Sequence, residues 1–190
     1  YHVLKDYLNE NKDNVMEKLL FFTLVVENAS LFSQFATILY FSRFKGYMKN
    51  VANMIAWSSV DEDLHSKAGT WILSKIFEEK PEFREKAEKE ATSFIQDYIK
   101  MEDELLDWIF EQGELDHVKK KDLGNYMRYR LNSSFKDLKL PPPFELTEED
   151  IKPMMWFEEE VFSNELDDFF AKRPVAYTKH DKSITANDLF

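Results

Sequence analysis

The sequence contains no cysteine, and only 4 of its 190 residues are glycine and 6 are proline. Without cysteine, the chain can form no disulfide, no thiolate metal site and no thiol nucleophile. Glycine and proline interrupt helices and shape tight turns, so their scarcity favours long helices and argues against a β-sandwich or barrel. Three of the prolines are consecutive, at 141–143, and predict a rigid non-helical connector.

The chain also lacks an excess of basic charge and long apolar runs. Its formal net charge is −11 and its isoelectric point is about 4.9, with basic residues interleaved among acids. Nucleic-acid binding normally requires a basic patch, so we expect no direct binding of DNA or RNA. The longest apolar candidate, residues 19–26, is broken by Thr23 and is well short of the roughly 20 residues of a membrane span. With no signal-peptide pattern either, we expect a cytoplasmic protein that has no membrane segment.

Apolar residues recur at helical spacing over residues 13–44, 48–78, 81–112 and 119–135. Asp13 suits the N-cap of the first helix, Pro81 suits the first turn of the third, and Gly46 and Gly113 suit helix ends. A short helix is expected to start at 147–150, followed by an acidic, aromatic segment at 156–170. We predict an all-α fold with a helical domain at 1–171 and a flexible tail at 172–190.

One carboxylate interrupts an apolar helix face. Glu27 lies in line with Leu20, Leu24, Leu31 and Phe35, at spacings of three and four residues. Burying an unpaired charge costs several kcal/mol, so a buried Glu27 would need an arginine, a proton or a metal ion as compensation.

The second helix carries a similar feature. Glu62 and His65 stand one turn apart, on a face predicted to pack inward together with Ile55, Ser58, Gly69 and Ile72. By themselves these residues could be a solvated carboxylate and a hydrogen-bonded structural histidine, and Glu27 could be a salt-bridge partner. Together, a Glu on one helix and Glu-x-x-His on the next are half of the dinuclear metal motif of ferritin-like bundles. The remaining histidines, His2, His117 and His180, are interpreted as surface residues.

Several segments resemble, in family order, the small, radical-generating subunit of class I ribonucleotide reductase. They are residues 26–32, 60–65, 105–113, 125–131, 138–144 and 168–177. Residues 60–65 read Val-Asp-Glu-Asp-Leu-His and are similar to the family's Arg-Asp-Glu-x-x-His, with Val60 in place of the arginine. Leu31 and Phe35 flank Glu27 at positions where relatives often have aromatic residues. The resemblance covers essentially the whole chain but only the C-terminal half of the family's subunit.

The resemblance implies a ferritin-like bundle with a dinuclear metal centre, most readily of iron, with manganese or a mixed Mn/Fe pair as alternatives. Glu27, Glu62 and His65 would be ligands to that centre. Asp61 would connect the centre to a radical-transfer chain through hydrogen bonds. Tyr177 would relay the radical to the large catalytic subunit, on which the C-terminal tail would dock. The large subunit would then reduce ribonucleoside diphosphates to deoxyribonucleotides.

The resemblance further implies a partner that supplies the rest of the site. The chain begins at Tyr1 in mid-pattern, and Gly69 stands four residues beyond His65, so this copy of the motif offers no radical tyrosine. We therefore expect the N-terminal half of a split subunit to supply the remaining ligands and that tyrosine, within a dimer of small subunits. Two alternatives are a homodimeric ferritin-like oxidase or storage protein, built by two copies of this chain, and a non-catalytic helical docking module.

Overall fold

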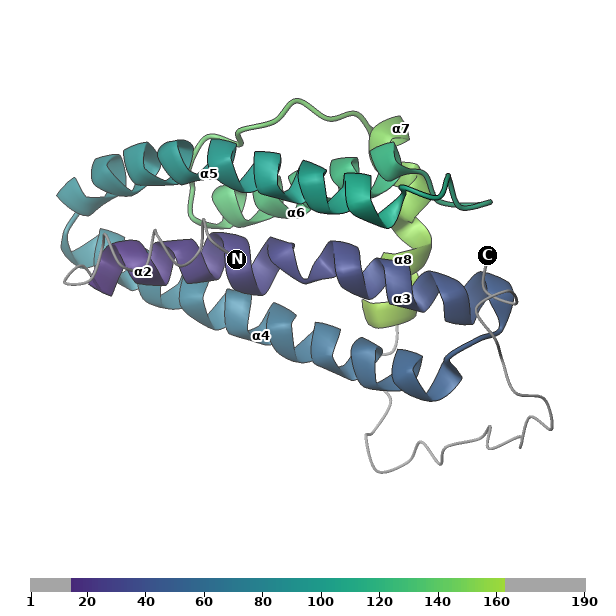
Figure 1. Cartoon of the computed structure of the whole chain (residues 1–190). Helices are drawn as coiled ribbons and strands as arrows, with labels where there is room; N and C mark the ends of the chain where they lie inside the picture. The colour runs from purple at the N-terminus through teal and green to yellow at the C-terminus, as the bar shows by residue number, and fades with distance from the viewer. Residues whose placement is uncertain (1–14, 163–190) are drawn as a thin grey trace.

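The computed structural model describes residues 15–162 (Figure 1). The predictions for Asp13, His2, His180, Tyr177 and the 172–190 tail therefore lie outside the described residues.

The described residues form helices joined by loops, with no β-strand among them. The prediction of an all-α chain is confirmed, and the helices predicted at 48–78, 81–112 and 119–135 are found within a few residues of those bounds. The elements are α2 (Val15–Phe21), the π-helix η1 (Phe22–Ser30), α3 (Phe32–Lys45), α4 (Lys49–Glu79), α5 (Glu82–Ile109), α6 (Lys120–Asp137), α7 (Glu148–Ile151), the 3₁₀-helix η2 (Lys152–Met154) and α8 (Met155–Phe162).

The long helices lie side by side along a common direction, as Figure 1 shows. The rod formed by α2, η1 and α3 packs against α4, and α5 and α6 lie on the other side of the rod. The short helices α7 and α8 close one end of this bundle. The buried core contains aliphatic and aromatic side chains from all the long helices, among them Leu24, Leu73, Ile95 and Tyr126.

The helix ends follow the sequence signals in part. Gly46 ends α3 in the left-handed conformation (φ 72°), and its amide donates to the Ser42 carbonyl, as predicted from a glycine at this position. The third helix ends earlier than predicted, because α5 stops at Ile109 and turns at Phe110, before Gly113. The short helix at 148–151 begins with Thr147 and Asp150 in a capping box.

The first predicted helix differs from expectation in its hydrogen bonding. Residues 13–44 were expected to form one regular α-helix, but the segment Phe22–Ser30 is a π-helix. A π-helix pairs each amide with the carbonyl five residues earlier, so it fits additional chain into the same length and rotates the side chains that follow. No residue type marks this pairing, and the apolar periodicity over the segment still reads as α-helical.

The rod from Val15 to Lys45 is long and apolar enough to cross a membrane by length and composition, with a mean hydropathy of 1.4 in its most apolar window. This length is not evident from unbroken apolar runs, because Thr23, Glu27 and Asn28 interrupt the apolar sequence. In the fold, 61% of that window is buried against other helices. We interpret the rod as the core helix of the bundle, because core helices can be apolar on all sides.

Candidate metal centre

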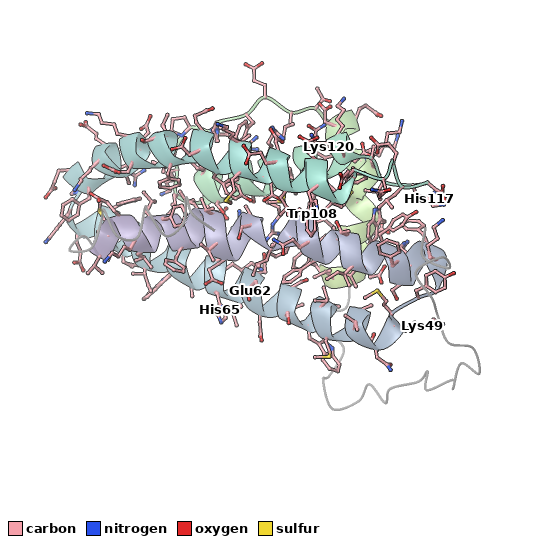
Figure 2. The ribbon with its side chains drawn as sticks, viewed as in Figure 1. Lys49, Glu62, His65, Trp108, His117 and Lys120 are labelled. Atoms are coloured by element: carbon pink, nitrogen blue, oxygen red, sulfur yellow. The ribbon has the colours of Figure 1, made fainter. Side chains whose placement is uncertain are left out.

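Glu27, Glu62 and His65 come together in the structure. Each offers one ligand atom, and these atoms all lie within 4.8 Å of one another. The Nδ1 atom of His65 is 3.3 Å from Glu62 Oε2 and 3.5 Å from Glu27 Oε2. Figure 2 shows Glu62 and His65 on α4, beside the rod that carries Glu27. The sequence prediction that these residues belong to one group agrees with this placement.

Two helical elements set the direction of these side chains. Glu62 and His65 are three residues apart on α4, so their side chains leave the same side of the helix. Glu27 lies in the π-helix η1, where the altered turn changes the direction in which its side chain leaves the rod. Helix α4 packs closely against η1, and π-helical segments occur frequently at functional sites.

The group lies at the edge of the fold, which corrects two sequence predictions. Glu27 was expected to be buried and Glu62 and His65 to face inward, but their side chains are 26%, 23% and 61% exposed. The buried face of α4 instead consists of Ala52, Ser59, Ser66, Gly69, Leu73 and Phe77. Ser58 and Ile72, which were also predicted to face inward, are exposed. Apolar residues therefore extend around more of the α4 surface than the other described helices bury.

The carboxylates repel each other at this distance. Burial, together with the hydrogen bond and negative charge of Glu62, raises the pKa of Glu27 to about 7, against the opposing effect of His65. The hydrogen bond to Glu62 and the charge of Glu27 raise the pKa of His65. A cation between these groups would replace the proton that relieves the repulsion.

The donor set is suited to a transition metal. Two carboxylates and one imidazole favour iron or manganese over calcium or magnesium, which prefer oxygen ligands alone. The Nδ1 atom is the ring nitrogen that faces both carboxylates, so it is the nitrogen placed to act as a ligand. The residues present therefore fit one side of a dinuclear metal centre.

The other predicted site residues do not join this group. Asp61 is exposed on α4, and its side chain forms no hydrogen bond or ion pair with the described residues. His117 is exposed and stacks on Phe44 with ring centroids 4.7 Å apart, so the interpretation as a surface residue is confirmed for it. Tyr177 lies outside the described residues.

Sequence reasoning missed a buried arginine beside the group. Arg130 lies on the apolar face of α6 together with Tyr126, Met127 and Leu131, and all four are buried. The signal was available, because a charged residue in an apolar stripe needs a partner, as was argued for Glu27.

Comparison with known proteins identifies the family. The family model described as "Ribonucleotide reductase, small chain" matches residues 1–153. The chain belongs to the ribonucleotide reductase small-chain family. Among this family's curated proteins, the chain is 27% identical over 169 residues to "Probable ribonucleoside-diphosphate reductase small subunit 048L" of Invertebrate iridescent virus 3. It is 36% identical over 70 residues to "Probable ribonucleoside-diphosphate reductase small subunit 376L" of Invertebrate iridescent virus 6.

The fold of the ribonucleotide reductase small chain is found in a crystal structure as well. The structure of a protein described as a "putative class I ribonucleotide reductase" from Bacillus halodurans matches with a TM-score of 0.70 at 21% identity. The match covers 84% of this chain and 57% of that one, and it confirms the predicted ferritin-like helical fold.

This small chain spans only part of its relatives. The matched residues make up 88% of this chain but 44% of the 048L protein, and for the 376L protein the shares are 37% and 19%. The residues thus correspond to less than half of a ribonucleotide reductase small subunit of the 048L kind.

Proposed function

We propose that this chain supplies one half of the dinuclear metal site of a ribonucleoside-diphosphate reductase small subunit. The observation that carries the proposal is the convergence of Glu27, Glu62 and His65 at an uncovered edge of the fold. Membership of the family supports it, since the ligands fall on the chain's two motif segments. The assembled enzyme would convert ribonucleoside diphosphates to deoxyribonucleotides, and we place it in the cytoplasm.

The chain's own residues would hold and orient the metal. Glu27 and Glu62 would provide carboxylate oxygens and His65 its Nδ1 nitrogen, with one of the carboxylates able to bridge two ions. We expect iron, with manganese or a mixed pair as alternatives. When bound, such a centre supplies one-electron oxidising chemistry at O2, which protein side chains alone do not provide.

A second set of ligands must come from beyond these three residues. Apolar side chains are exposed on α4, the helix that carries Glu62 and His65, and they include Trp57, Leu64 and Trp71. Such a surface can be covered by other helices. We propose that the covering helices carry the matching carboxylate and Glu-x-x-His, from the other half of a small subunit. Subunits of this family would then pair as dimers and dock on a large catalytic subunit.

Radical transfer would use two further residues. Asp61 is next to Glu62 and exposed on α4, so it is free to bond to a covering helix. We propose Tyr177 as the interfacial redox residue and the segment 172–190 as the docking tail, on the basis of the sequence resemblance.

The proposal is tested by anaerobic loading with Fe(II) and Mn(II), followed by metal quantification. The chain is measured alone and with the candidate complementing half, and we expect about two metal ions per completed site and little metal on the chain alone. Glu27→Ala should greatly reduce the bound metal. The matched control is Glu104→Ala, which removes an exposed glutamate of α5.

The other outcomes contradict the proposal in different ways. Stoichiometric binding by the chain alone would favour the homodimeric oxidase or storage protein, in which two copies complete the site. No binding in either sample would leave a helical docking module as the better description.

A further inference from the structure

Arg130 joins α6 to the residue that follows the first carboxylate ligand. Its side chain is 8% exposed. Its Nε donates to the backbone carbonyl of Asn28 at 3.1 Å, and Asn28 Nδ2 donates to the backbone carbonyl of Arg130 at 2.6 Å. Asn28 directly follows Glu27 in η1. This reciprocal pair of hydrogen bonds fixes the η1 backbone to α6 next to the ligand.

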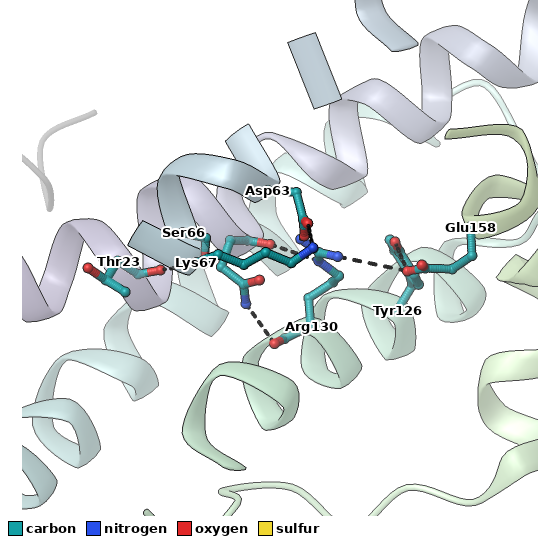
Figure 3. Close-up of polar contacts among 8 residues, drawn as sticks. Thr23, Asp63, Ser66, Lys67, Tyr126, Arg130 and Glu158 are labelled. Carbon is teal, nitrogen blue, oxygen red and sulfur yellow. Dashed lines mark hydrogen bonds and ion pairs between the residues drawn. The ribbon is translucent and has the colours of Figure 1, made fainter. Parts of the chain in front are cut away.

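The far end of the same guanidinium reaches the second ligand's neighbour. Arg130 Nη2 donates to Asp63 Oδ1 at 3.0 Å, and Asp63 directly follows Glu62 in α4. Lys67 holds the other oxygen of Asp63, with 2.7 Å between Nζ and Oδ2 (Figure 3). One side chain thus bonds to the residue after Glu27 and to the residue after Glu62.

The guanidinium is itself held in place. Its central carbon lies 3.9 Å from the centroid of the Phe32 ring, and its Nη1 lies 3.9 Å from Glu158 Oε1. Glu158 accepts a hydrogen bond from the Tyr126 hydroxyl (Figure 3). Because a guanidinium is planar, remains charged and presents donors in fixed directions, it can act as a rigid spacer between η1 and α4. It has no lone pair for a metal, so it does not act as a ligand.

We propose that Arg130 is a positioning residue, which sets the separation of the Glu27 and Glu62 carboxylates and thereby the affinity and geometry of the metal site. The inference rests on the proposed metal-binding function. Groups that orient metal ligands without touching the metal typically change affinity by about 10- to 100-fold. Arg130 acts on Glu27 through Asn28 and on Glu62 through Asp63. Its removal should therefore change the distance between the two carboxylates more than the solvent exposure of either one.

The test compares Arg130→Met with Arg128→Met in the subunit as it occurs naturally, together with the polypeptide that completes its site. Arg128 is a suitable control, because it lies on the same helix but bonds to the Gly124 carbonyl and to Asp103 of α5. The measurements are the Mn(II) dissociation constant by electron paramagnetic resonance and the visible spectrum of bound Co(II). We expect Arg130→Met to weaken Mn(II) binding roughly tenfold and to alter the Co(II) spectrum, and Arg128→Met to do neither.

An unchanged Mn(II) affinity and Co(II) spectrum in folded Arg130→Met would overturn the positioning role, even if its thermal stability fell. If that variant does not fold, Asp63→Ala replaces it. It removes the bond of Arg130 to α4 and the ion pair with Lys67, and it leaves both bonds between Arg130 and Asn28. The same weakening is expected for Asp63→Ala, and its absence also overturns the role. If the wild-type subunit binds neither ion, the proposed function fails together with this inference. If the wild-type subunit binds the metal normally and the variants bind it equally well, the inference about Arg130 fails but the proposed function stands.

Discussion

At the scale of single residues, Glu102 of α5 is a buried carboxyl group outside the candidate metal centre. It accepts a hydrogen bond from the Ser33 hydroxyl and a longer one, 3.4 Å, from the Tyr98 hydroxyl. Burial raises the pKa of Glu102, and these two hydrogen bonds only partly oppose the effect. Burial also raises the pKa of Tyr98 well above its ordinary value, so the phenol stays protonated. Glu102 therefore keeps its proton to a higher pH in the folded chain than in the unfolded one.

The raised pKa predicts how stability depends on pH. Below the pKa of an unfolded glutamate both states are protonated, and Glu102 contributes no pH dependence. As the pH rises toward the folded pKa, the unfolded state loses its proton first, so the free energy of unfolding falls. Glu102→Gln cannot ionise and should lack this fall, so its stability relative to wild type should increase with pH. Urea unfolding over a pH series measures the difference, and a constant difference would show that Glu102 ionises normally.

Residue chemistry explains which site residues could be predicted from the sequence. Glu27, Glu62 and His65 stood out because polar groups in apolar stripes at helical spacing signal a shared function. Arg130 carried the same signal, but its partners Asn28 and Asp63 are 102 and 67 residues away along the chain. Contacts of that range depend on how the helices pack, which the periodicity of a single helix does not specify.

At the scale of elements, Gly69 determines how closely α4 approaches η1. A Cβ atom added at Gly69 would lie 2.1 Å from Thr23 Oγ1 and 3.1 Å from Thr23 Cβ. Thr23 is buried, and the carbonyl of the same residue accepts a hydrogen bond from Ser66 at 3.4 Å. The two helices therefore meet with backbone and short side chains, a contact that only glycine permits on the α4 side.

This close approach predicts that Gly69→Ala destabilises the fold by about 1–3 kcal/mol, a typical effect of an inserted methyl group in a packed core. Helix propensity alone would favour alanine by up to roughly 1 kcal/mol, so steric overlap must outweigh it. Chemical denaturation monitored by circular dichroism measures the change. Thr23→Ala in the same chain removes the nearest atom and should restore part of the loss. A variant as stable as wild type would mean that α4 can move away from η1 without cost.

The elements themselves were predicted more completely than their packing. Long apolar periodicities and a few breakers located α4, α5 and α6 within a few residues. The π-helix and the rim position of Glu62 and His65 were not predicted, because hydrogen-bond register and the coverage of a face are set by neighbouring elements. Periodicity identifies a face as apolar but does not say which polypeptide covers it.

At the scale of the whole molecule, α4 is apolar on more than one side. Its inner side packs on the rod and on other helices, while Trp57, Val60, Leu64 and Trp71 are exposed on the outside. Trp57, Leu64 and Trp71 are seven residues apart, which is the spacing of a helix that packs along its length. A helix that is apolar all round is normally enclosed by protein. The candidate metal-binding group of Glu27, Glu62 and His65, two of which lie on the same helix, supports the proposal that ligand-bearing helices cover it.

The covering helices can be tested with a matched pair of tryptophan variants. Trp71 of α4 and Trp108 of α5 are similarly exposed, at 64% and 72%, but only Trp71 lies on the helix that carries Glu62 and His65. Because a glutamate at a packed helix interface must lose its hydration, Trp71→Glu should weaken binding of the complementing half at least tenfold. Trp108→Glu should leave the binding unchanged, and neither variant should alter the thermal unfolding of this chain alone. Calorimetric titration of the two halves measures the affinity.

Two other outcomes would contradict this prediction. Equal affinities for both variants would place the complementing helices elsewhere. If the chain instead associates with itself, and only Trp71→Glu abolishes that association, the covering partner is a second copy of the chain.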